Sequence, residues 1–108
     1  MDFKKKNSIL KYIFKKGVNS RDISFLCNGL SCMINAGISV SQALNIIASQ
    51  CNKKTLRESL YRVERNVSRG ESIHKSLKKE SDMYPLFMNE MIKIGEESGK
   101  LDKILKDL

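Results

Sequence analysis

Acidic side chains, thiols and one histidine are the groups of this 108-residue chain that could carry chemistry. Glu96, Glu97 and Asp102, with Glu90 a short distance upstream, offer the oxygen ligands that a divalent cation takes. Three cysteines together with His74 offer zinc ligands, but their spacing fits no known zinc pattern. Adjacent carboxylates near a helix junction are more often solvated, and an isolated histidine is more often a surface residue. We therefore predict no metal, no cofactor and no catalytic residue.

The cysteines and glycines add no catalytic pattern. Cys27, Cys32 and Cys51 are odd in number, form no Cys-x-x-Cys pair and follow no secretory signal, so reduced cytoplasmic thiols are expected. The glycines are too scattered to form a phosphate-binding loop. The sequence consequently predicts a protein that is not an enzyme.

The net charge of +8 is concentrated near the start of the chain. Residues 1–21 hold seven Lys or Arg against one Asp, whereas residues 22–108 hold thirteen basic and eleven acidic side chains. Residues 4–16 predict a basic amphipathic helix, because lysines surround four apolar residues at helical spacing, namely Ile9, Leu10, Ile13 and Phe14. Such a helix either packs loosely in solvent or touches an anionic membrane surface or an acidic partner. We therefore divide the chain into a basic N-terminal arm, 1–21, and a helical domain, 22–108.

A second feature is a segment of thirty residues, 23–52, without a single charged side chain. Surface helices normally carry charges on the face that meets water. This segment is therefore expected to be buried on most sides, either within the domain or in an oligomer interface. Residues 53–69 differ sharply, with six basic and two acidic side chains, and residues 80–108 carry seven acidic and four basic ones.

The spacing of apolar residues predicts short helices throughout the domain. No segment alternates with a period of two, and no apolar run approaches the ~20 residues of a membrane span. Capping residues predict helix starts at Ser20–Asp22, Ser39 with Gln42, Thr55 with Glu58, Ser72 and Pro85. Helix ends are expected at Gly37, Gly70 and Gly99. The expected fold is an all-α, antiparallel (up-and-down) bundle of about six short helices.

The segment from Ala36 to Leu44 resembles the turn and second helix of a helix-turn-helix. A recognition helix needs side chains that reach base edges, together with phosphate contacts close by. Gln42, Asn45 and Gln50 could reach bases, but residues 38–52 carry no charge. A small DNA-binding protein is therefore an alternative hypothesis, and it predicts binding to duplex DNA that weakens steeply with salt.

The same segment also resembles the opening of the cytoplasmic F domain found in polytopic platform proteins of type II secretion systems and type IV pili. Members of that family show a hydrophobic helix ending in Ala-Gly, then an aliphatic, often a Pro, another aliphatic, and Ala-Leu three residues on. This chain has Ala36-Gly37 and Ala43-Leu44 at those places. It departs from the family at Asn28-Gly29, where Arg-Gln is usual, and at Ser39, where Pro is usual.

Three later motifs extend the resemblance to residue 105. Gly70 with Ser72 resembles the family's Gly-x-Ser, and Tyr84-Pro85 stands where an aromatic-Pro pair is usual. The family's most recognisable string, Gly-Glu-x-Ser-Gly-x-Leu, is matched by Gly95, Glu96, Ser98, Gly99 and Leu101. Of the glycines in that string, Gly99 is expected to separate two helices and Gly95 to let another helix approach.

The resemblance implies a non-enzymatic cytoplasmic domain of a platform protein in the cell (inner) membrane, with membrane spans expected beyond residue 108. It implies a homodimer, contact with other inner-membrane components, and coupling to the hexameric assembly ATPase that drives pilin or pseudopilin polymerisation. No nucleic acid partner is then expected. Residues 53–69 are the candidate docking face for acidic partners, through Arg57, Arg62, Arg65 and Arg69. A basic-armed helical adaptor without membrane spans is a third hypothesis.

Overall fold

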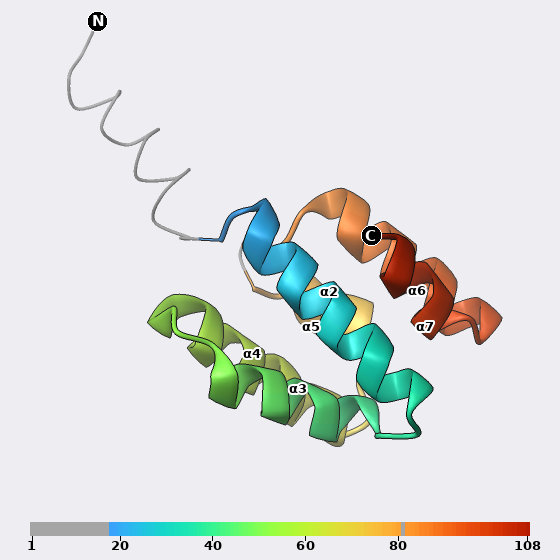
Figure 1. Cartoon of the computed structure of the whole chain (residues 1–108), viewed down its shortest axis with the longest axis horizontal. Helices are drawn as coiled ribbons and strands as arrows, with labels where there is room; N and C mark the ends of the chain where they lie inside the picture. Colours follow the sequence, from blue (N-terminus) through green and yellow to red (C-terminus); the bar gives the residue numbers. More distant parts are fainter. Residues whose placement is uncertain (1–17, 81) are drawn as a thin grey trace, which may run out of the picture.

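The computed structural model describes residues 18–80 and 82–108, and this part of the chain contains six helices and no strand (Figure 1). The helices are α2 (Ser20–Asn35), α3 (Val40–Gln50), α4 (Lys54–Ser68), α5 (Ile73–Lys78), α6 (Leu86–Ser98) and α7 (Leu101–Asp107). The predicted all-α class is therefore confirmed. Within the described ranges, no helix combines the length and the apolar character that crossing a membrane requires. The predicted arm helix, 4–16, lies outside the described residues, and the division at residue 22 stays a prediction.

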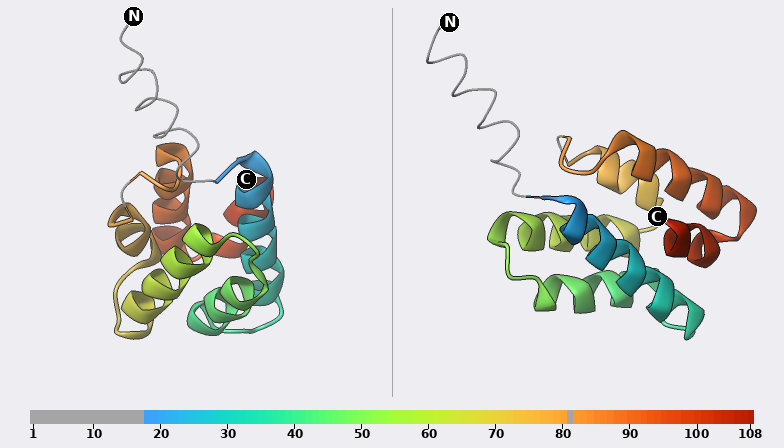
Figure 2. Two further views of the ribbon diagram at one scale, coloured as in Figure 1. Left: turned by 90° about the vertical axis from the view of Figure 1, so that its left-hand side faces the viewer. Right: turned by 45° about the horizontal axis from the view of Figure 1, so that its top comes forward.

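The six helices form a closed ring. Each helix packs against the next one along the chain, and α7 packs back against α2 (Figures 1 and 2). Successive helices run in opposite directions, as an up-and-down bundle requires. Helices α2, α4 and α6 therefore begin at one end of the bundle, and α3 and α5 finish there.

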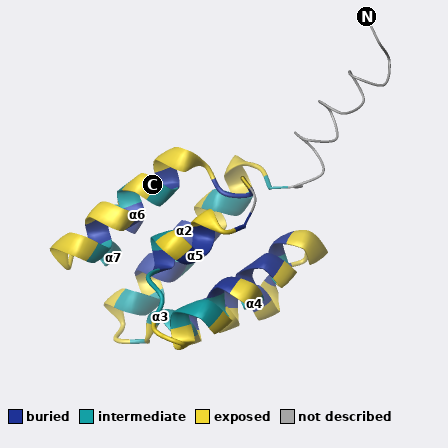
Figure 3. Cartoon of the chain, turned by 180° about the vertical axis from the view of Figure 1, so that it is seen from behind, coloured by how far each residue is buried: buried dark blue, intermediate teal, exposed yellow. Residues whose placement is uncertain are grey.

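The apolar core fills the inside of this ring. Every helix contributes to it, and the buried faces turn inward while the exposed faces turn outward (Figure 3). The largest fully buried apolar side chains are Leu26, Leu30, Leu44, Ile47, Leu56, Leu60, Val63, Met88, Ile92 and Leu105. Because α2 and α7 both place leucines in this core, the ring is held together from within.

Local capping contacts explain where α2 and α3 begin. Asn19 Oδ1 accepts the Asp22 N–H at 2.9 Å, and the Asn19 N–H donates to Asp22 Oδ2 at 3.0 Å. The cap of α2 is thus Asn19, one residue before the predicted range, and Asp22 is its reciprocal partner. The prediction for α3 is confirmed, since Ser39 Oγ accepts the Gln42 N–H at 3.1 Å.

The predicted start of α4 at Thr55 is wrong. The helix begins at Lys54, and its cap is Lys53, which makes no side-chain capping bond. A tertiary contact accounts for the difference: Lys53 Nζ lies 2.6 Å from Asp22 Oδ2 in α2. The Arg57 N–H donates to the Lys53 carbonyl at 2.8 Å, so the first turn closes on Lys53 rather than on Thr55.

The uncharged segment 23–52 supplies α2 and α3 with buried inner faces but not with buried outer ones. Asn28, Asn45 and Gln50 are exposed, and Phe25 is 45% exposed. The predicted burial on most sides is therefore not met within the domain itself. The outer faces of α2 and α3 are therefore uncharged over residues 23–52 and accessible to solvent.

Candidate functional site

The junction between α5 and α6 is organised by one carboxylate, that of Glu96. Glu96 Oε2 accepts the Ile73 N–H at 2.8 Å, and Glu96 Oε1 accepts the His74 N–H at 2.9 Å. The first N–H groups of a helix lack partners within that helix and carry a partial positive charge, which a carboxylate satisfies. Glu96 therefore caps α5 from a different helix.

The His74 ring joins the same contact. His74 Nδ1 lies 2.7 Å from Glu96 Oε1, and the two side chains are only 19% and 20% exposed. The expectation that His74 is an isolated surface residue is therefore wrong, because the helix that Glu96 caps also brings the ring to it. The hydroxyl of Ser72, which occupies the N-cap position of α5, is buried without a hydrogen-bond partner among the described residues.

The sequence places Glu96 in a family motif but does not indicate this capping role. The two partners lie more than twenty residues apart, so no local spacing indicates the contact. One signal was available: α5 carries no acidic residue in its first turn. A six-residue helix without its own capping carboxylate needs one from elsewhere in the fold.

Gly95 and Gly99 let α7 fold back against α6. A methyl group on Gly95 would lie 2.9 Å from Leu101 Cα and 3.1 Å from Leu101 Cδ1, closer than side-chain atoms approach backbone. Gly99 ends α6 with φ +73°, a left-handed conformation that glycine adopts without strain. The hydroxyl of Ser98 donates to the Gly95 carbonyl at 3.4 Å. The string from Gly95 to Leu101 is therefore a compact helix junction.

The remaining motif residues lie at other junctions. Ala36 and Gly37 form the exposed turn after α2, while Ala43 and Leu44 are fully buried in α3. Gly29, one of the departures from the family, packs closely, since a methyl group there would lie 3.1 Å from Ile47 Cδ1. Gly70 follows the end of α4, and Pro85 precedes the first residue of α6. The motif residues that the sequence singles out thus lie where helices meet.

Two contacts attach the loop before α6 to α4. The hydroxyls of Ser59 and Tyr84 lie 2.9 Å apart in the core, and burial raises the pKa of the Tyr84 phenol. Arg62 donates from Nε and Nη2 to the buried carboxylate of Glu80, with the shortest distance 2.7 Å. A bidentate guanidinium–carboxylate pair fixes orientation as well as distance. Glu80 and Tyr84 are therefore both attached to α4.

The four candidate docking arginines differ in their surroundings. Arg62 is committed to Glu80, and Arg57 Nη1 donates to the Cys51 carbonyl at 3.1 Å. Arg65 and Arg69, near the end of α4, are exposed and take part in none of the ion pairs found within 18–80 and 82–108. Of these four arginines, Arg65 and Arg69 are therefore the two whose exposed side chains make no ion pair or hydrogen bond to another residue of the described ranges.

The metal ligands considered from the sequence do not come together. In the described part of the chain, no three His, Cys, Asp or Glu side chains are grouped so that they could hold an ion. Cys27 and Cys51 are buried and Cys32 is exposed, so the thiols are spread over different sites. On α3, Gln42, Asn45 and Gln50 are exposed, but no cation accompanies them in residues 23–52.

The closed bundle and its junctions define a small all-α structural domain in which the motif residues are used to pack one helix on another. The chain belongs to the family described as "Type II secretion system (T2SS), protein F", whose profile matches residues 26–108. It is 29% identical to the type II secretion system protein F of Aeromonas hydrophila, over 89% of this chain and 25% of the relative. It is 32% identical to the type IV pilus assembly protein PilC of Thermus thermophilus, over 87% of this chain and 23% of the relative. The chain thus spans about a quarter of the length of these relatives.

Proposed function

We propose that these residues form a cytoplasmic domain of a membrane platform protein in type IV pilus biogenesis or type II-like secretion. The domain acts as a non-enzymatic scaffold on the cytoplasmic side of the cell membrane. It couples the hexameric assembly ATPase to the polymerisation of pilin or pseudopilin subunits. The observation that carries the proposal is the family match over residues 26–108, which takes in most of α2 and all of α3 to α7 of the closed ring.

The ring supports a coupling role because its parts are tied to one another. The Arg62–Glu80 pair, the Ser59–Tyr84 contact and the Glu96 cap each join segments that are distant in the sequence. A bundle cross-linked in this way moves as one body when a partner displaces one face. The side chains that hold the ring are therefore distinct from those that would meet the ATPase.

The ATPase contacts the end of α4 in this proposal. Arg65 and Arg69 are exposed there and form no internal ion pair within the described ranges. Opposite charges on two surfaces steer association and fix the register of the complex. Arg57 and Arg62 lie on the same helix but serve mainly to hold the domain together.

Charge reversal at Arg65 and Arg69 tests this contact. We expect the double variant Arg65→Glu and Arg69→Glu to bind the purified ATPase of the same host at least about tenfold more weakly, with unfolding unchanged. The matched control is Lys93→Glu with Lys103→Glu, which reverses two exposed charges on α6 and α7. Equal affinity of the two double variants would remove the docking face. Failure of the wild-type chain to bind the ATPase at all would remove the coupling role.

The outer face of α2 and α3 supports the homodimer in the same proposal. It is uncharged over residues 23–52 and exposes two large apolar side chains, Phe25 and Ile46. Interfaces between identical subunits are poor in charge at their centres. Sedimentation of the wild-type chain and of Phe25→Lys with Ile46→Lys tests this, and we expect the charged variant to be monomeric.

A further inference from the structure

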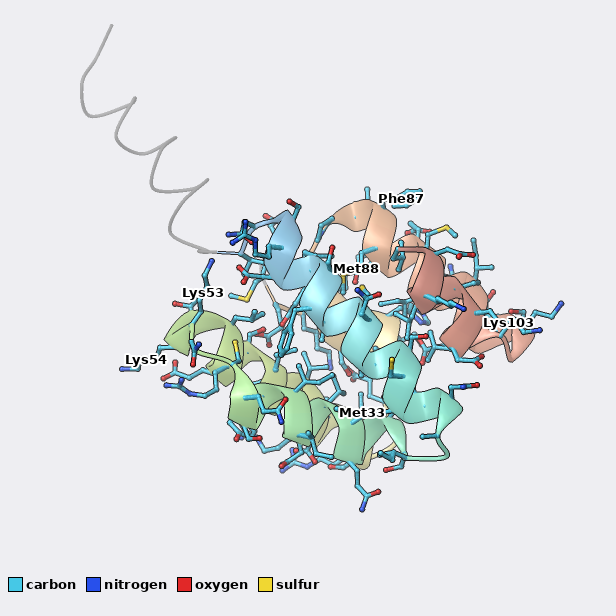
Figure 4. All side chains as sticks on the ribbon, in the orientation of Figure 1. Met33, Lys53, Lys54, Phe87, Met88 and Lys103 are labelled. Atoms are coloured by element: carbon cyan, nitrogen blue, oxygen red, sulfur yellow. The ribbon has the colours of Figure 1, made fainter. Side chains whose placement is uncertain are left out.

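The outer face of α6 exposes more large apolar side chains than any other helix in residues 18–80 and 82–108. Five such side chains are exposed there, and α6 carries three of them: Leu86, Phe87 and Ile94. Phe87 is 68% exposed and projects from the outer side of α6, away from the other helices (Figure 4). Large apolar side chains grouped on one face mark a surface that another apolar surface covers.

The spacing of these residues suits a second helix. Phe87, Met91 and Ile94 follow one another at intervals of four and three, so they form one stripe along the outside of α6, here called the α6 stripe. Ile94 is 51% exposed, and Met91 is partly exposed. Rows of side chains at these intervals are the ridges on which another helix packs. The α6 stripe is therefore an unpartnered helix-packing face.

The charges that border the α6 stripe are negative. Glu90 lies three residues after Phe87 and four before Ile94, and Glu97 lies three residues after Ile94, which are the spacings of neighbours on a helix surface. Both glutamates are exposed, and neither takes part in an ion pair within the described ranges. A partner of this face is therefore expected to be apolar with positive flanks.

The cations of the same part of the ring lie off the α6 stripe. Lys93 borders the two glutamates on the side away from the stripe. Lys78 and Asp82, which have opposite charges, line one open pocket at the start of α6. Lys103 and Lys106 of α7 line a groove against α2. None of these lysines replaces the negative border of the stripe.

The chain itself contains a segment with the matching pattern, in the basic arm. Residues 1–17 hold six lysines and one aspartate. In the predicted helix over 4–16, the apolar residues Ile9, Leu10, Ile13 and Phe14 share one face. At helical spacing, Lys11 flanks this face on one side and Lys16 on the other. The arm thus pairs an apolar stripe with positive flanks.

The arm also joins the ring at a suitable place. It leads into residue 18 and then α2, and α2 and α6 begin at the same end of the bundle (Figures 1 and 2). The predicted helix over 4–16 has as many residues as α6, 13, which corresponds to about 20 Å. An arm helix that ends near this junction can therefore lie along α6 in the antiparallel direction.

We propose that the basic arm, residues 4–16, packs antiparallel along the outer face of α6 of the same chain. Its apolar residues cover the α6 stripe, which removes both apolar surfaces from water. Its flanking lysines lie beside Glu90 and Glu97, and these rim charges fix the orientation and register of the arm. Of the contacts open to a basic amphipathic helix, the arm then makes the one with an acidic partner, and that partner is α6.

Fluorescence of one introduced tryptophan tests this contact, because the chain contains no tryptophan. In the 108-residue chain, we expect Phe87→Trp to emit in the blue and to resist quenching by acrylamide, since the arm covers this position. The same variant with Leu10→Ser and Phe14→Ser should emit as a solvent-exposed tryptophan. The matched control is Leu86→Trp, which lies off the α6 stripe at the adjacent position. It should keep a solvent-exposed spectrum with either arm.

An exchange of charges tests the rim. In the Phe87→Trp chain, Glu90→Lys with Glu97→Lys should shift the emission to the red, and added salt should shift it part of the way. Adding Lys11→Glu and Lys16→Glu to that variant should restore the blue emission, which a merely structural effect of the first pair would not allow. The substituted side chains of α6 are exposed, so unchanged circular dichroism serves as the folding control.

Three outcomes would overturn the proposal. The first is a solvent-exposed spectrum of Phe87→Trp when the arm is unaltered. The second is a blue emission that persists after the two arm serines are introduced. The third is a blue emission that is lost on dilution, which would assign the α6 stripe to a second copy of the chain. The assay contains no ATPase, so this proposal and the proposed function can fail separately.

Discussion

Glu96 holds His74 by two atoms at once: its Oε1 accepts the His74 backbone N–H at 2.9 Å and lies 2.7 Å from Nδ1 of the ring. The second oxygen accepts the Ile73 N–H. A six-residue helix is far below the length that is stable alone in water, so its position depends on contacts of this kind. The place of α5 in the ring is therefore set largely by a side chain of α6.

Substitution of Glu96 by Gln should destabilise the domain. The amide keeps the size of the side chain but replaces one accepting oxygen with a donor, which leaves a helix N–H without a partner. We expect a loss of about 1–3 kcal/mol in the free energy of unfolding, measured with urea. Glu97→Gln is the control, since Glu97 is exposed, and should change stability by no more than about 0.5 kcal/mol. Equal effects at both positions would argue against the cap.

Two glycines should respond differently to alanine. In Gly95→Ala the new methyl group meets the backbone of Leu101, so α7 must move, and we expect a loss of about 1–3 kcal/mol. In Gly29→Ala the methyl group meets only the side chain of Ile47, at 3.1 Å from Cδ1, so a shift of that side chain by a few tenths of an ångström makes room for it. The gain in helix propensity of up to about 1 kcal/mol offsets this crowding. Urea unfolding of the two variants should rank Gly95→Ala as clearly the less stable, and the reverse order would contradict the packing of α7.

The Asp22 carboxylate should make part of the stability depend on pH. Burial raises the pKa of Asp22, but hydrogen bonds from Lys53 and from the Asn19 backbone outweigh burial, and the net pKa is lowered from 3.8. A group with a lowered pKa in the folded state stabilises above its unfolded pKa, and this contribution is lost as the pH falls through the folded value. We expect Asp22→Asn to be less stable than the wild type near neutral pH, with the difference shrinking below about pH 4. A difference that persisted into that acid range would show that charge is not involved.

The three thiols should differ in reactivity. Burial raises the pKa of the Cys27 thiol to about 11, so its thiolate is scarce at neutral pH, and Cys51 is also buried. Cys32, in α2, is exposed. We expect an aromatic disulfide reagent to modify one thiol quickly in the folded chain and all three in denaturant. The variant Cys32→Ser should lose the fast phase, and a fast phase that survives would place another thiol at the surface.

Local sequence signals predicted the parts of the fold that local forces control. The ends expected at Gly37, Gly70 and Gly99 are confirmed, and all three residues have positive φ. Ser39 caps α3 as expected from its spacing to Gln42. In each case the residue type and its immediate neighbours are sufficient to decide the conformation.

Contacts between distant segments account for what local signals did not predict. Helix α4 begins at Lys54 and not at the predicted Thr55, because Lys53 pairs with Asp22 of α2. The His74 side chain is mostly buried, and not a surface residue as predicted, because it contacts Glu96 of α6. A carboxylate that will cap another helix has the same sequence pattern as one that stays solvated. Only the packing of the ring distinguishes the two.

The packing of α7 against α2 has a consequence for synthesis on the ribosome. Ser31 donates to the Asp102 carbonyl at 2.8 Å, and Leu105 lies fully buried in the same core as Leu26 and Leu30. A nascent chain that ends before Leu105 therefore leaves the leucines of its first described helix open to water. Until α7 has been synthesised, the emerging polypeptide exposes an apolar surface on α2 that chaperones can bind and that α7 later covers.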